Sequence, residues 1–144
     1  STEQSRFDIE RTLRRYNCSE FGYSTTANSA RIGFRLNGLS VLFTLPLPDR
    51  NSREFTHTET RGSLRSSANR EEAWEQACRQ RWRALGLCIK AKLEAVECGI
   101  TTLEDEFLAH IVTETGETVG ERMVPHLAKI AAGKIPLLPP PRSE

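Results

Sequence analysis

The stretch that decides the fold is Asn69–Gly99, NREEAWEQACRQRWRALGLCIKAKLEAVECG. Its apolar residues recur at steps of three and four, which is the spacing of one face of an α-helix. They are Trp74, Cys78, Trp82, Leu85, Ile89, Leu93 and Val96. Asn69 suits the N-cap and Gly99 suits the position after the C-terminus, so we expect one helix of about eight turns. This helix needs another element to cover its apolar stripe.

A second patterned stretch, Ser29–Leu47, predicts that covering element. Asn37 and Gly38 favour a two-residue type I′ turn, in which both residues have positive φ. The turn pairs Leu36 with Leu39 and sends the alternating apolar residues to one face of a hairpin. Those residues are Ile32, Phe34, Leu36, Leu39, Val41, Phe43 and Leu45. The hairpin therefore has one face suited to the long helix and one open face.

The segments on either side complete the outline. Phe7–Tyr16 predicts a short helix, and the alternation in Cys18–Thr25 predicts a third strand. After Gly99, a helix should start at Thr101 or Thr102 and carry Phe107, Leu108, Ile111 and Val112 on its apolar side. Thr118–Ala132 predicts a last helix with Val119, Met123, Leu127 and Ile130 facing inward.

The expected architecture is a single α+β domain spanning residues 1–144. A three-stranded antiparallel meander packs on a long amphipathic helix, followed by two short helices and a Pro-rich tail at 135–144. Residues 49–68 show no periodicity and are rich in Arg, Ser and Thr, so they predict a flexible loop. Apolar residues are 38% of the 144, which suffices for one core, and no segment is apolar enough to span a membrane.

No motif in the chain points to catalysis. Phosphate-binding, dinucleotide-binding, zinc-protease and nucleophile-elbow signatures are all missing, so we expect no enzyme activity and no cofactor. Glu106 and His110 are four residues apart on a predicted helix, but no further ligand is marked, and a surface ion pair is the simpler interpretation. The four cysteines form no C-x-x-C pair, which favours reduced thiols and a cytosolic setting.

Charge is distributed unevenly although the net charge is only +1. Residues 50–92 contain ten Lys or Arg against five Asp or Glu, whereas residues 93–121 contain eight acids and neither Lys nor Arg. If loop, helix edge and open sheet face adjoin, the cations form one basic groove suited to a phosphate backbone. The candidates are Arg31, Arg35, Arg50, Arg53, Arg61, Arg65, Arg79, Arg81, Arg83, Lys90 and Lys92. A solvated basic face, balanced by the acids of the same chain, is the plainer interpretation.

Aromatic and acidic residues add two further expectations. Phe55 and Trp82 are candidates for stacking on unpaired bases, although a core or interface position is the alternative for Trp82. Glu104, Asp105 and Glu106 compensate a helix dipole, or they form part of an acidic protein-binding surface.

Two stretches, EEAWEQACRQRWRALGLCIKAKLEAVECGITTLEDEFLAHIV and RIGFRLNGLSVLFTLPLPD, carry a resemblance. They resemble a family of small bacteriophage and prophage proteins that has no assigned activity. The resemblance implies a phage-encoded protein in the host cytoplasm. In topology alone, a meander crossed by a long helix is similar to phage single-strand annealing proteins of the RecT and Redβ type.

Two functional hypotheses follow. The first is a non-enzymatic phage-type accessory protein that binds nucleic acid, with single-stranded or deformed DNA favoured over RNA. The second is an inhibitor or modulator of a host system, of the anti-defence kind, that acts through its acidic surface. Either could act as a homo-oligomer, because a three-stranded sheet has two edges and an uncovered face.

Overall fold

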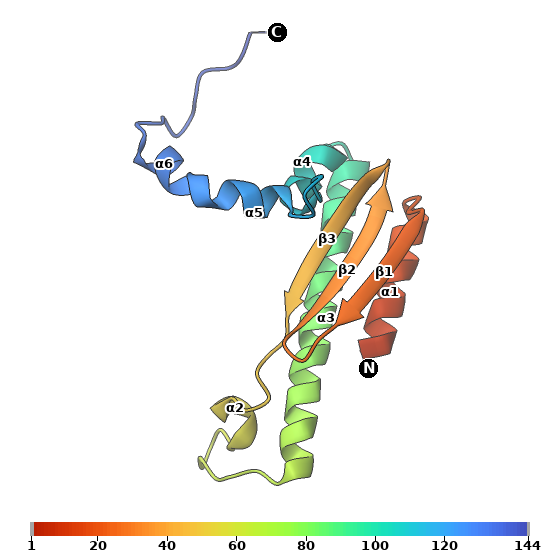
Figure 1. Ribbon diagram of the computed structural model, residues 1–144, viewed down its shortest axis with the longest axis vertical. Coiled ribbons are helices and arrows are strands. Elements are labelled where there is room, and N and C mark those ends of the chain that lie inside the picture. The colour runs from red at the N-terminus through yellow and green to blue at the C-terminus, as the bar shows by residue number, and fades with distance from the viewer. Residues whose placement is uncertain (1, 144) are drawn as a thin grey trace.

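The computed structural model describes residues 2–143 and has the expected α+β architecture. A three-stranded antiparallel sheet lies across the long helix α3, with α1 beside that helix (Figure 1). The elements are α1 (Thr2–Arg15), β1 (Glu20–Thr25), β2 (Ser29–Leu36), β3 (Leu39–Pro46), α2 (Arg53–Thr56), α3 (Ser67–Glu97), α4 (Leu103–Phe107), the 3-10 turn η1 (Leu108–His110), α5 (Val119–Met123), the 3-10 turn η2 (Val124–His126) and α6 (Leu127–Ala132).

The hairpin forms as its turn sequence predicts. Asn37 and Gly38 have φ values of 48° and 80°, and Leu36 pairs with Leu39. Side chains alternate between the two faces of β2, so Ile32 and Phe34 are buried against the helices while Arg31 is exposed. The sheet thus has one apolar face and one open face.

Helix α3 covers the apolar face with the predicted stripe. Its buried residues are Cys78, Trp82, Leu85, Ile89 and Leu93. The N-cap is Ser66, whose side chain accepts a hydrogen bond from the backbone N–H of Asn69, so the helix starts slightly earlier than predicted. Gly99 has φ 80° and ends the helix as expected. Burying a side chain such as Ile89 contributes about 1.5–3 kcal/mol to the free energy of unfolding, so the stripe supplies much of the stability of the core.

Helix α1 is longer than the predicted Phe7–Tyr16 and packs alongside α3. Ile9 and Leu13 are its buried residues. The contact is close because α3 has a glycine there: a Cβ at Gly86 would lie 3.3 Å from Cγ1 of Ile9. Asn17, with φ 64°, ends this segment directly after the predicted C-terminus at Tyr16.

The prediction that Ile111 and Val112 continue a helix is wrong. The helical segment ends at His110, and Val112 donates its backbone N–H to the carbonyl of Ser40 at 2.8 Å, beside the edge of β3. Phe107, fully buried, anchors this segment against two rings of the sheet. Its ring meets those of Phe34 and Phe43 edge to face, at centroid distances of 6.1 and 6.3 Å. An apolar run of this length suits a strand edge as well as a helix face.

The inward orientation predicted for the last helix is wrong for three of its four apolar residues, since only Val119 is half-buried. Residues 121–143 are all exposed, and residues 123–143 extend away from the body as an arm (Figure 1). The structure places Met123, Leu127 and Ile130 outside the core, and Leu137 in the Pro-rich tail is 96% exposed. None of the helices formed by residues 2–143 has the length and apolar character needed to cross a membrane.

Candidate nucleic-acid interface

The eleven predicted basic residues do not share one groove. Helix α3 lies behind the apolar face of the sheet, so the sheet itself separates the open-face cations from those on the helix (Figure 1). The open face of the sheet carries Arg31 and Arg35, and residues 49–68 carry Arg50, Arg53, Arg61 and Arg65. On α3, the side facing α1 carries Arg79, Arg83 and Lys90. The side of α3 facing β3 carries Arg81 and Lys92. The single-groove geometry is therefore corrected to several separate groups.

Two of these groups meet along α3. Arg79, Arg83 and Lys90 follow one another on one line of the helix, because four residues turn by about 400° and seven by about 700°. Arg65 lines the same surface hollow as Arg79. We call Arg65, Arg79, Arg83 and Lys90 the basic strip.

None of the four cations of the basic strip forms an ion pair with another residue in the described range 2–143. Arg79 bonds only to the amide oxygen of Gln76, at 2.6 Å, and Arg65 reaches the carbonyl of Phe55 at 3.5 Å. Their charges remain available to an external anion.

A groove of about 300 Å³ runs between α1 and α3 beside this strip. Its lining includes Ile9, Trp82 and Gly86 between the helices, together with Arg83 and Lys90. The missing side chain of Gly86 keeps α1 and α3 close together while leaving space at the surface. A lone glycine within a helical pattern is the sequence signal that could have marked this close approach.

The predicted stacking residues are buried. Phe55 is 4% exposed and Trp82 is 3% exposed, so neither presents a free ring face to a base. Phe55 belongs to the one-turn helix α2 within the 49–68 segment, and Trp82 lies in the middle of the α3 stripe. Core packing explains both, and the expectation of base stacking there is wrong.

Trp74, not Trp82, is the half-buried tryptophan of α3. Its Nε1–H donates to the carbonyl of Pro48 at 2.7 Å, and the Arg50 guanidinium covers its ring at 3.7 Å from the centroid. Arg50 also donates to Glu71 at 2.6 Å, so its charge is partly neutralised. This cluster joins the 49–68 segment to α3, so the main role of Arg50 is to stabilise the fold.

On the open face of the sheet, Arg31 is exposed and forms no ion pair with any residue from 2 to 143, whereas Arg35 donates to Glu20 at 3.1 Å. Gly22 and Gly33 lie directly opposite each other between these arginines. The face is therefore shallow and only weakly basic.

The negative charges of residues 93–121 are mostly not neutralised by ion pairs with the basic residues 50–92. Within residues 2–143 a single ion pair, Lys92–Glu106 at 3.3 Å, links residues 50–92 to residues 93–121. Glu104 and Asp105 are exposed in the first turn of α4, which Thr102 caps. The surface thus keeps a basic region and an acidic region apart.

The surface ion pair expected between Glu106 and His110 is wrong, because each side chain has a different partner. Glu106 accepts from Lys92, and the His110 ring stacks on Phe43 at 3.9 Å between centroids. Burial, followed by the charge of Lys92, lowers the pKa of His110 below its ordinary value, and a hydrogen bond that the ring donates to the Leu42 backbone opposes this. In the described part of the chain no three His, Cys, Asp or Glu side chains gather as metal ligands would.

The cysteines are free thiols in different surroundings. Cys78 is buried in the α3 stripe, where desolvation raises the pKa of its thiol, whereas Cys88 and Cys98 are exposed. Of the four cysteines, Cys78 is the one that packs as a small buried core residue.

No protein-family model matches this chain, and comparisons with curated proteins and with solved structures found no match.

Proposed function

We propose that this protein is a non-enzymatic accessory protein of phage type that binds nucleic acid through the basic strip on α3. The observation that carries the proposal is that Arg65, Arg79, Arg83 and Lys90 follow one surface without ion-pair partners among residues 2–143. Guanidinium groups in a row suit phosphate oxygens, which they can bind with two parallel hydrogen bonds.

Single-stranded DNA is the favoured ligand. The groove beside the strip combines the cations Arg83 and Lys90 with the exposed apolar side chain of Leu87. An unpaired base can lay an apolar face against such a surface, whereas the bases of a duplex are stacked inside the helix. Phosphates would lie along Arg79 and Arg83.

Binding should depend strongly on salt. Four phosphate contacts on a single strand give a slope of about −2.8 for log affinity against log salt concentration. Between 50 and 200 mM salt this corresponds to roughly a 50-fold loss of affinity.

The experiment is fluorescence anisotropy with a labelled single-stranded oligonucleotide at low salt. The Arg79→Glu/Arg83→Glu variant should lose binding. The matched control, Arg31→Glu/Arg35→Glu, makes the same change in net charge on the open sheet face and should bind like the parent protein. Equal loss in both variants, or no loss in the first, would contradict the assignment to the basic strip.

A second candidate function is an inhibitor or modulator of a host protein, favoured by the uncancelled acids. Glu104 and Asp105 are exposed and form no ion pair within the described chain. A basic host partner would be captured in a salt-sensitive manner. Capture should disappear in Glu104→Lys/Asp105→Lys and persist in Arg79→Glu/Arg83→Glu. The reverse pattern would favour nucleic acid.

A further inference from the structure

The C-terminal arm, residues 123–143, exposes more apolar surface than a free-standing segment normally keeps. Its exposed apolar side chains include Met123, Val124, Leu127, Ile130, Leu137 and Leu138. Isolated exposed apolar residues need no explanation, but a series of them on one projecting segment marks an interaction surface.

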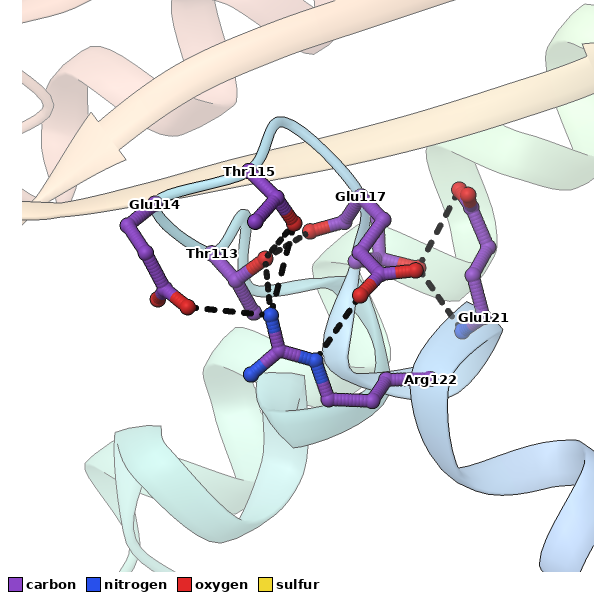
Figure 2. Close-up of polar contacts among 7 residues, drawn as sticks. Thr113, Glu114, Thr115, Glu117, Glu121 and Arg122 are labelled. Carbon is purple, nitrogen blue, oxygen red and sulfur yellow. Dashed lines mark hydrogen bonds and ion pairs between the residues drawn. The ribbon is translucent and has the colours of Figure 1, made fainter.

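The root of this arm is built rigidly. Arg122 donates to Glu117 at 2.8 Å, to Glu114 at 3.1 Å and to Thr113 at 3.2 Å, so one guanidinium holds both sides of the turn before α5 (Figure 2). The hydrogen bond with Glu117, followed by that with Glu114, raises the pKa of Arg122, which therefore stays charged.

Close packing of α5 against η1 fixes the same root. A Cβ at Gly120 would lie only 2.8 Å from the carbonyl oxygen of Ala109, so the two backbones touch. Because its root is fixed in one orientation, the arm loses little conformational freedom there when it binds a partner.

Charge identifies the partner. The arm carries Lys129, Lys134 and Arg142 and no acidic residue, so it is basic as well as apolar. The complementary surface is on the body of the same chain, at the end of α3 and along α4 and η1. There the exposed acids Glu104 and Asp105 are flanked in the sequence by Ile100, which is 79% exposed, and Leu108, which is half exposed.

Both halves of a complementary pair are thus present in one chain, but among residues 2–143 no ion pair joins the arm to the patch. The arm leaves the body beside η1 and points away from it (Figure 1). We propose that the arm docks on a second copy of this chain, each arm lying on the patch formed by Ile100, Glu104, Asp105 and Leu108 of the other copy. A two-fold axis beside the arm roots makes the exchange reciprocal and closes the assembly as a dimer.

The test measures molar mass by size exclusion with light scattering, using the full chain at about 100 µM and in a dilution series. The parent protein should be a dimer. Lys129→Glu/Lys134→Glu in the arm, and separately Glu104→Lys/Asp105→Lys in the patch, should each weaken dimerisation at least tenfold. All four side chains are exposed, and circular dichroism checks that the variants remain folded.

The decisive sample combines both pairs of substitutions. Charge complementarity predicts that the four-residue variant, with patch and arm signs exchanged, recovers the dimer. The Arg31→Glu/Arg35→Glu variant is the control for net charge and should stay dimeric. A monomeric parent protein, or a four-residue variant that remains monomeric, would overturn the proposal.

Discussion

Replacing Phe107 with Ala tests how the acidic segment and the arm root are attached to the body. The ring is fully buried and meets the rings of Phe34 and Phe43 at 6.1 and 6.3 Å. Truncating a buried Phe to Ala costs about 3–5 kcal/mol of unfolding free energy, because apolar contacts are lost and a cavity remains. The result should lie at the upper end of this range, since both edge-to-face pairs disappear.

The expected loss converts into a large thermal shift. For a body of roughly 120 residues, the entropy of unfolding is about 0.25 kcal/mol per degree, so Tm should fall by about 12–20 °C. Thermal and urea unfolding, followed by circular dichroism, measure this directly. Leu108→Ala is the matched control next in sequence: the side chain is half exposed, and its loss should cost about 1 kcal/mol or less. A shift under about 3 °C for the Phe107 variant would refute the packing described for this segment.

Three further predictions concern the arm root, pH and the hairpin turn. Gly120→Ala should lower the free energy of unfolding by about 1–3 kcal/mol and speed proteolysis of the arm, because the new Cβ would lie 2.8 Å from the Ala109 carbonyl oxygen. Unchanged proteolysis would refute this close approach. The pKa of His110 is lowered in the folded state, so the unfolded chain binds the His110 proton more tightly. The free energy of unfolding should therefore fall as pH drops below about 6.5 towards the folded-state pKa. Urea titrations at several pH values measure this, and the His110→Gln variant should show a flatter pH profile. Gly38→Ala should lower the unfolding free energy by about 1 kcal/mol because φ is 80°, whereas Gly22→Ala, with open space and no positive φ, should not destabilise the protein; equal urea midpoints would contradict the turn assignment.

The parts of the fold that were predictable are those set by local pattern. The turn at Asn37 and Gly38 needs positive φ at both positions, which few other dipeptides supply as readily, and it fixes the register of the whole hairpin. The α3 stripe and its stop at Gly99 follow from periodicity and a single glycine. None of these features depends on contacts with distant residues.

The parts that were mispredicted depend on tertiary contacts. An apolar pair such as Ile111 and Val112 fits a helix face or a strand edge, and only the neighbouring β3 edge decides between them. The arm shows the same problem: the spacing of Leu127 and Ile130 is that of a buried helix face, although no part of the body covers it. Periodicity indicates an apolar face without saying what lies opposite.

The site was partly predictable. The hairpin pattern already places Arg31 and Arg35 on the face that the long helix does not cover, but the single groove expected from their charge set this placement aside. The proximity of Arg65 to Arg79 does not, because it depends on how the 49–68 segment returns to α3. The pairing of Arg50 with Glu71 and Trp74 depends on the same tertiary contact and could not be predicted from the sequence.

The most direct test of the central claim is the salt dependence of single-stranded DNA binding, measured by anisotropy from 50 to 200 mM salt. Four phosphate contacts on the basic strip predict a slope of about −2.8 for the parent protein and about −1.4 for Arg79→Gln/Arg83→Gln, because two of the four contacts are removed. No binding by the parent protein at 50 mM, or identical slopes for the two proteins, would contradict a nucleic-acid interface on the basic strip.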